Sequence, residues 1–201
     1  QKFFTIIKNS IYLDVFDVNQ TKQILLAGKE YLNAEAAFHG DELNCIGAAE
    51  LAAEINAKSV SHLEFISDEG IKRMAQKEIV GIVCPTTAYL LKLQSPPVRQ
   101  MIQQNVPIAI GSDFNPNAHC YSLPMAMNIG AVKCGMTLNE TLIATTINAA
   151  FALNRSNLYG SLEVGKIADC VLINAPDWRH LIYQFGNTKS MIKHVIKNGN
   201  I

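Results

Sequence analysis

Short apolar runs alternate with amphipathic stretches through the middle of the chain. Four of these runs end at His39, His62, Cys84 and Asp113, which gives intervals of 62−39 = 23, 84−62 = 22 and 113−84 = 29 residues. Such spacings suit βα units, in which a helix returns the chain to the start of the next parallel strand. The pattern therefore predicts an α/β fold with a parallel sheet.

The strand signal differs in strength from run to run. Residues 80–83 and 106–110 are nearly continuous in apolar and β-branched residues, as in strands that are buried on both faces. The run before His39 is rich in alanine, a poor strand former, so its place in the series is what predicts a strand there. Residues 12–16 are predicted to form one earlier strand.

Helical signals fill the intervals between the strand-like runs. Residues 48–55 carry apolar side chains four positions apart, which favours an amphipathic helix. Ser67 precedes two acidic residues, as at a capped helix N-terminus. Thr137 and Glu140 have the spacing of a capping box, and we predict a helix from there to about Ala152.

The pattern changes after Gly160. Residues 170–173 and 195–199 are typical of short strands and turns, and no helical pattern separates them. Two strands alone cannot bury a face of their own. We therefore expect a small β element whose packing partners lie elsewhere, in an upstream part of the protein.

Composition narrows the classes of function. The 201 residues are 49% hydrophobic and 17% charged, as in an ordinary globular protein, and 17 basic residues balance 17 acidic ones. This balance argues against nucleic acid or a membrane as a partner. Five scattered cysteines without a C-x-x-C pair favour free thiols in a reducing, cytoplasmic location.

The start of the chain carries its own expectation. It begins with Gln1 instead of Met, it lacks a signal-peptide pattern, and no apolar run is long enough to span a bilayer. We expect that an upstream segment belongs to the same protein.

Candidate chemistry gathers where the strand-like runs end. His39, His62 and Asp113 would meet at the carboxyl edge of a parallel sheet, where α/β proteins build their sites. Imidazole and carboxylate are ligands that suit zinc or iron. The alternatives are histidines satisfied by the backbone and an Asx-turn formed by Asp113 before Pro116.

Other polar residues near these ends have competing explanations. Glu42 could carry a proton or bind a substrate, or it could stabilise a helix N-terminus. The second explanation suits Asp41 better, and we assign Asp41 no catalytic role. His119 is expected in an exposed loop that could line a pocket, and His180 and His194 are expected to be structural or solvated within the C-terminal β segment.

Several motifs, in order along nearly the whole chain, resemble the imidazolonepropionase family of amidohydrolases, and more the animal form than the bacterial one. They are residues 38–43 (Phe-His-Gly-Asp-Glu-Leu), 61–64 (Ser-His-Leu-Glu), 67–70 (Ser-Asp-Glu-Gly), 85–87 (Pro-Thr-Thr), 111–116 (Gly-Ser-Asp-Phe-Asn-Pro), 146–150 (Thr-Ile-Asn-Ala-Ala), 160–166 (Gly-Ser-Leu-Glu-Val-Gly-Lys) and 180–186 (His-Leu-Ile-Tyr-Gln-Phe-Gly).

The resemblance implies the C-terminal half of a (β/α)8 TIM-type barrel in residues 1–158 and part of a small β-sandwich in residues 159–201. It implies hydrolysis of 4-imidazolone-5-propanoate to N-formimidoyl-L-glutamate in histidine degradation, with one zinc or iron ion (divalent or ferric) as cofactor. The expected binding partner of the protein is this small-molecule substrate. Whether the full-length protein forms a homodimer is left open.

The resemblance also assigns roles to individual residues. His39 and Asp113 would bind the metal, and Asp113 would also handle the proton of the attacking water. Glu42 would bind the imidazolone ring or shuttle a proton, and His62 would orient the water or the substrate oxygen.

Three further positions would contact the substrate. Asn115 would bind its glutamate end, and Asn117 and Ala118 occupy neighbouring positions, where the bacterial pattern has Gly and Ser.

Two departures from the family pattern limit what this chain is expected to do alone. It contains no His-x-His, the motif that supplies two further metal ligands, and residues 14–18 look shortened relative to the family. We therefore expect the chain alone to be inactive. The alternatives are another cyclic amidohydrolase or deaminase of the superfamily, and a truncated, inactive product that acts as a subunit or binding partner.

Overall fold

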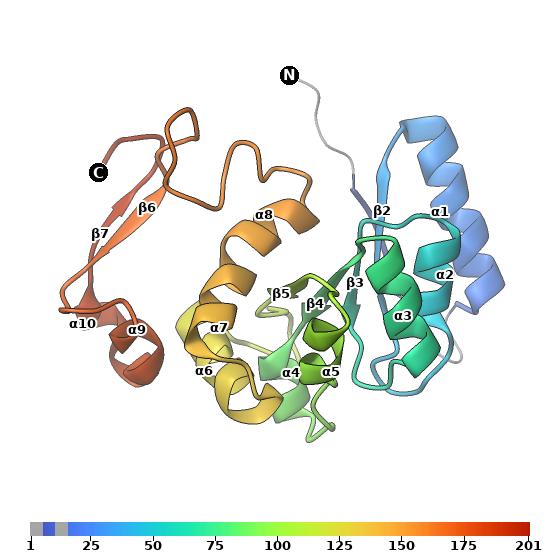
Figure 1. Cartoon of the computed structure of the whole chain (residues 1–201), viewed down its shortest axis with the longest axis horizontal. Helices are drawn as coiled ribbons and strands as arrows, with labels where there is room; N and C mark the ends of the chain where they lie inside the picture. Colours follow the sequence, from blue (N-terminus) through green and yellow to red (C-terminus); the bar gives the residue numbers. More distant parts are fainter. Residues whose placement is uncertain (1–5, 11–15) are drawn as a thin grey trace. The chain divides into compact units, whose positions relative to one another are not determined.

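A computed structural model of the chain describes residues 6–10 and 16–201 (Figure 1). Most of the predicted strand at 12–16, and part of the segment at 14–18, lie outside these residues. Two compact units are present: one reaches Val83 and includes Leu93–Ile108, and the other joins Cys84–Lys92 to Ala109–Ile201. The division at residues 158 and 159 stays a prediction.

A five-stranded sheet follows the order of the chain, β1-β2-β3-β4-β5. Its strands are β1 (Ile6–Ser10), β2 (Glu35–Gly40), β3 (Ser59–His62), β4 (Val80–Val83) and β5 (Ile108–Ile110). The first four pair in parallel, with Gly40 of β2 opposite His62 of β3. The predicted parallel sheet is confirmed, including the alanine-rich strand before His39, in which Ala36 and Phe38 are almost fully buried.

Helices of the first unit run beside this sheet (Figure 1). They are α1 (Val18–Leu32), α2 (Ala48–Glu54), α3 (Asp68–Gln76) and α5 (Val98–Gln103). Leu51 of α2 and Ile55 directly after it are buried, so the predicted apolar face of residues 48–55 is confirmed. Ile71 and Met74 of α3 are buried as well. The Ser67 hydroxyl accepts the Gly70 N–H, as its capping position predicts.

The second unit begins with helices. They are α4 (Pro85–Leu90), α6 (Leu123–Cys134), α7 (Leu138–Thr145) and α8 (Ile147–Ala152). The capping box of Thr137 and Glu140 is confirmed at the start of α7. No described helix is long and apolar enough to cross a membrane.

The prediction of one helix to Ala152 is wrong, because the helix breaks at Thr146 (φ −121°, ψ −94°). The hydroxyls of Thr145 and Thr146 both donate to carbonyls one turn earlier, a bond that competes with helical hydrogen bonding. Gly160 lies against the break: a Cβ there would lie 2.8 Å from the Ile147 Cα, and its φ is +93°.

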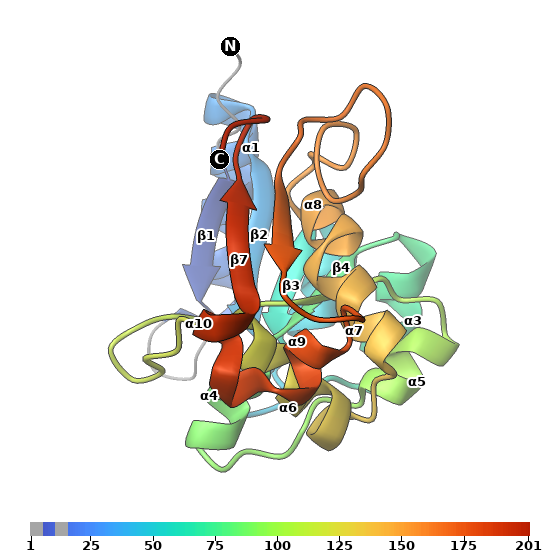
Figure 2. The ribbon, with the colours of Figure 1, turned by 90° about the vertical axis from the view of Figure 1, so that its left-hand side faces the viewer.

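An antiparallel pair of strands, β6 (Cys170–Ile173) and β7 (Ile192–Ile196), follows in the same unit (Figure 2). The expectation that no helix separates them is wrong. The turns α9 (His180–Tyr183), η1 (Phe185–Asn187) and α10 (Thr188–Met191) intervene. Each has at most four residues, which is too short to produce a helical period in the sequence.

Candidate active site

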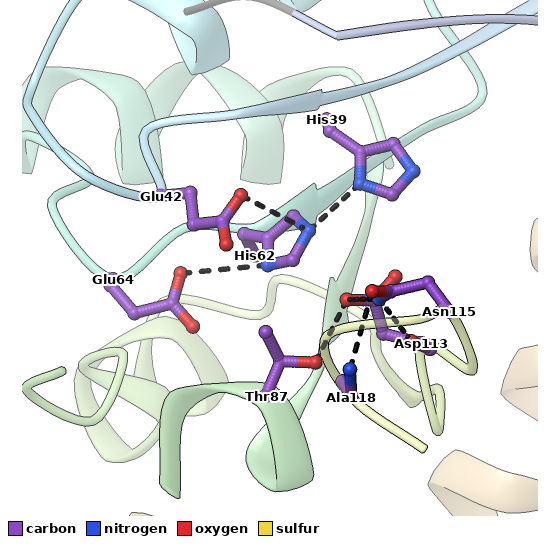
Figure 3. Close-up of polar contacts among 8 residues, drawn as sticks. All are labelled: His39, Glu42, His62, Glu64, Thr87, Asp113, Asn115 and Ala118. Atoms are coloured by element: carbon purple, nitrogen blue, oxygen red, sulfur yellow. Dashed lines mark hydrogen bonds and ion pairs between the residues drawn. The ribbon is translucent and has the colours of Figure 1, made fainter. Parts of the chain in front are cut away.

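His39 and His62 stand on neighbouring strand ends and face each other (Figure 3). His39 Nδ1 lies 2.8 Å from His62 Nε2, and the ring centroids are 4.8 Å apart with a tilt of 46°. Only 8% of His39 and 1% of His62 is exposed. The structure thus brings together two of the histidines that the sequence singled out, as a buried pair.

The turn that follows His62 has an unusual backbone. His62 and Leu63 have φ values of +82° and +70°, in the left-handed region that side chains other than glycine rarely adopt. The Leu63 N–H donates to the Gly40 carbonyl and the Phe65 N–H donates to the Asp41 carbonyl. The end of β2 therefore holds the turn in place, and such local strain is common at functional sites.

Two buried carboxylates flank the His62 ring, one at each nitrogen (Figure 3). Glu42 Oε2 lies 3.5 Å from Nε2, and Glu64 Oε2 lies 4.0 Å from Nδ1. Glu42 is 6% exposed and Glu64 is 1% exposed. Glu64 had no predicted role, although an acid between Leu63 and Phe65, in an apolar context, is a signal that could have marked it.

Asp41 is a structural residue, as its position predicts. Its fully buried carboxylate accepts the backbone N–H groups of Ile46, Ala48 and Ala49 at the start of α2. Burial raises the pKa of the Asp41 carboxyl, while these hydrogen bonds oppose the rise. Gly40 permits the close packing, since a Cβ there would lie 2.2 Å from the Ala48 Cβ.

Asp113 lies in the second unit, three residues after β5, and it is positioned by hydroxyl groups of α4. The Thr87 hydroxyl donates to Asp113 Oδ2 at 2.8 Å, and the Thr86 hydroxyl donates to the Ser112 carbonyl at 2.8 Å. Asp113 itself has a left-handed backbone with φ +49°. The predicted motif at residues 85–87 thus has a physical function, which is to hold the acid.

The side chain of Asn115 is engaged within its own loop. Its Nδ2 donates to the carbonyl and to Oδ2 of Asp113, at 2.6 and 3.2 Å. Its Oδ1 accepts the N–H groups of Asn117 and Ala118, at 2.8 and 3.2 Å. These four contacts use the amide's usual capacity. Asn117 is exposed and Ala118 is buried.

Three rings gather on the exposed part of the same loop. Phe114 stacks on Tyr121 with centroids 4.3 Å apart, and His119 meets both rings edge-on at 4.9 and 5.1 Å. His119 is exposed, as expected. His180 lies in α9 instead of in a β segment, and His194 is exposed on β7.

The donor types at these strand ends suit a transition metal. Among the described residues, His39 and His62 of the first unit and Asp113 of the second offer the nitrogen and carboxylate atoms that metal sites use. His39 and Asp113 were predicted as ligands, whereas His62 was predicted to orient water. Nitrogen and carboxylate donors of this kind fit zinc or iron better than magnesium or calcium.

Known proteins share both sequence and fold with the chain. Residues 24–201 match the model of the amidohydrolase family. Proteins named "Probable imidazolonepropionase" are 51% identical in Nematostella vectensis and 50% identical in Homo sapiens, over 93% of this chain. The chain spans 43% and 44% of the length of these two relatives.

A solved structure agrees on the fold. An adenosine deaminase from Xanthomonas campestris, with bound zinc, superposes with a TM-score of 0.74 at 18% identity, covering 96% of this chain and 50% of the deaminase. The fold class expected from the motifs, a partial amidohydrolase barrel with part of a small β domain, is confirmed. Strands β1 to β5 form an open sheet, so the described strands do not close a barrel.

Proposed function

Since the chain belongs to the amidohydrolase family, we propose that the whole protein carrying it hydrolyses 4-imidazolone-5-propanoate to N-formimidoyl-L-glutamate in histidine degradation. Relatives that are half identical to the chain and named probable imidazolonepropionases support this substrate. The activity is assigned to the whole protein because the chain spans less than half of these relatives.

The observation that carries the proposal is the buried pair of His39 and His62, with a carboxylate near each nitrogen of His62. Burial of four ionisable or polar side chains is costly unless they bind each other, a metal or a substrate. Their position at the carboxyl ends of β2 and β3 is where barrels of this kind build active sites. A purely structural role would not require this concentration of proton-transfer groups.

The proposed cofactor is one zinc or iron ion, held by His39 and Asp113. Both donor types fit these metals. When bound, such an ion lowers the pKa of a coordinated water far below its bulk value, to about 7, which makes a nucleophile available at neutral pH.

Each of the candidate residues then has a role in proton transfer or in orienting the reacting groups. Asp113 accepts the proton of the attacking water and delivers it to the departing ring nitrogen, and the Thr87 hydroxyl keeps the acid oriented. Glu42 binds the imidazolone ring or shuttles a proton from its buried position. His62 orients the water or the substrate oxygen.

Binding of the substrate's other end is proposed for the loop after Asp113. Asn117 and Ala118 are proposed to contact the substrate's carboxylate, and in this structure their N–H groups donate to Asn115 Oδ1. A direct contact from the Asn115 side chain to the substrate would replace one of its four existing hydrogen bonds.

The setting of the enzyme is also proposed. We expect a cytoplasmic protein with a small-molecule substrate and no nucleic-acid or membrane partner, and a homodimer is the assembly to test. The balanced charge of the chain supports the expectation that neither nucleic acid nor a membrane is a partner.

The test is an assay of the whole protein with 4-imidazolone-5-propanoate, alongside a metal analysis. We expect formation of N-formimidoyl-L-glutamate and one zinc or iron ion per chain, with activity lost on chelation and restored by the metal. A metal-loaded, folded protein that does not turn over this substrate would overturn the proposed activity. Turnover without any bound metal would overturn the mechanism.

A further inference from the structure

The contact between the two imidazoles constrains the protons on both rings. His39 Nδ1 and His62 Nε2 are 2.8 Å apart, which is hydrogen-bond distance, so one nitrogen donates and the other accepts. A neutral imidazole carries a proton on one nitrogen only. The direction of this one hydrogen bond therefore fixes the tautomer of each neutral ring.

The two directions have different consequences for His39. If His39 Nδ1 donates, its Nε2 carries no proton and can bind a metal, and the proton of His62 is on Nδ1, 4.0 Å from Glu64 Oε2. If His62 Nε2 donates instead, the His39 proton is on Nε2, and that nitrogen cannot bind a metal. Glu42, 3.5 Å from His62 Nε2, attracts a proton in this second direction.

We propose that Glu64, His62 and His39 form a relay in the first direction, in which a hydrogen bond joins the two rings and charge attraction joins His62 to Glu64. Glu64 is then a positioning residue for the metal site. The relay rests on the proposed function, because it takes His39 as a metal ligand through Nε2. A ligating imidazole ordinarily donates its other N–H to a second group that fixes its orientation. Here His62 is that group, and Glu64 in turn fixes His62.

The backbone around Glu64 is held in a defined position. Its side chain is 1% exposed, so its carboxylate is not held there for solubility. Three hydrogen bonds hold the backbone of residues 63–65. The Leu63 N–H donates to Gly40, the Phe65 N–H donates to Asp41, and Gln94 Nε2 donates to the Glu64 carbonyl at 2.5 Å.

Glu64 Oε2 and His62 Nδ1 are 4.0 Å apart, which is too far for a hydrogen bond. The two groups therefore interact by electrostatic attraction. In a buried site such an attraction is weakly screened. Glu64 therefore favours a proton on Nδ1 of His62. The carboxylate of Glu42 is then left to face the substrate, in agreement with its proposed role.

The direct test is the proton position on His62. We would record ring ¹⁵N signals of the whole, zinc-loaded protein at one fixed pH, and assign the His62 signals by their loss in His62→Gln. The relay predicts a protonated Nδ1 and an unprotonated Nε2. A proton on Nε2, with or without one on Nδ1, would overturn it. This readout needs no turnover, so it separates the relay from the choice of substrate.

Variants of Glu64 provide a second test. Glu64→Gln removes the charge at nearly constant size, and we expect zinc affinity and kcat to fall about 10- to 100-fold with little change in KM, as for other residues that orient a metal ligand. Glu64→Asp should recover part of both losses. The matched control is Glu69→Gln, an exposed glutamate of α3 paired with Arg73, which should leave both unchanged.

The outcomes separate the two proposals. Normal zinc affinity and kcat in a folded Glu64→Gln would overturn the relay. Weakened zinc binding in Glu64→Gln, in a protein that does not hydrolyse 4-imidazolone-5-propanoate, would support the relay and overturn the substrate. If Glu64→Gln does not fold, the ring ¹⁵N spectrum of the unmodified protein still decides.

Discussion

The histidine pair and the loop of Asp113 are held in place in different ways. His39 and His62 project from paired strands and are almost fully buried, so packing and neighbouring carboxylates restrict their rings. Asp113 belongs to a partly exposed loop, where single hydrogen bonds from Thr87 and Asn115 hold its carboxylate. The sheet therefore fixes the histidine pair, whereas a few side-chain hydrogen bonds fix Asp113.

This difference has a consequence for function. A side chain fixed by a sheet is costly to move, because movement would disturb the core around it. A side chain held by hydroxyl and amide groups can be repositioned by one substitution. We therefore expect variants near the histidines to act through the metal or through folding, and variants near Asp113 to act through the orientation of the acid.

The largest effect is expected from His39→Asn. It removes a proposed ligand, and a metal contributes several kcal/mol of transition-state stabilisation, which corresponds to about a hundred- to thousandfold loss of kcat/KM. Metal content should fall in parallel. His119→Asn, on the exposed loop, is the matched control and should change neither value by much. Normal metal content in His39→Asn would contradict the ligand assignment.

A smaller effect is expected from Thr87→Val, which keeps the shape of the side chain and removes the hydrogen bond to Asp113. We expect activity to fall about 10- to 100-fold without loss of folding, as for other groups that orient a ligand. Thr188→Val is the control, because its hydroxyl donates to the Phe185 carbonyl at an exposed position. Equal activity in both variants would show that Asp113 does not depend on Thr87.

Asp41→Ala tests the packing on the histidine side. It leaves three N–H groups at the start of α2 without their acceptor, and we expect a loss of about 1–3 kcal/mol in the free energy of unfolding. Chemical denaturation of the whole protein measures this. Asp17→Ala, at the exposed N-cap of α1, should cost less, about 0.5–2 kcal/mol. The reverse order would mean that burial does not strengthen the Asp41 cap.

Tyr121→Ala is expected to have the smallest effect. The stacked pair of Phe114 and Tyr121 is exposed, and aromatic pairs contribute about 0.5–1.5 kcal/mol beyond the area they bury. Denaturation and the hydrolysis assay should both detect only a slight change. An activity loss larger than that of Thr87→Val would show that the rings, rather than the hydrogen bonds, hold the Asp113 loop.

Strand ends and helix caps could be predicted from the sequence, because they depend on hydrophobic periodicity and on neighbouring residues. Short-range rules predicted a strand end next to His39, a strand end at His62, the capping acid Asp41 and the capping box of Thr137. The structure bears them out. These rules involve residues close together in the chain, so one sequence is enough to apply them.

Contacts that depend on unusual backbone or on distant residues could not be predicted. Glu64 follows two residues of left-handed backbone, so the alternation of a strand does not tell where its side chain points. Thr87 meets Asp113 across 26 positions of sequence. At the break, the Thr146 hydroxyl donates to a backbone carbonyl of the preceding helix. The composition of the segment does not tell whether a threonine hydroxyl makes this bond.

One measurement tests the central proposal most directly. A crystal structure of the whole protein, with an anomalous difference map at the zinc or iron edge, locates the metal without reference to activity. We predict one peak, bound by a nitrogen of His39 and an oxygen of Asp113, with His62 beside it. A metal bound elsewhere, or bound without either His39 or Asp113, would contradict the account.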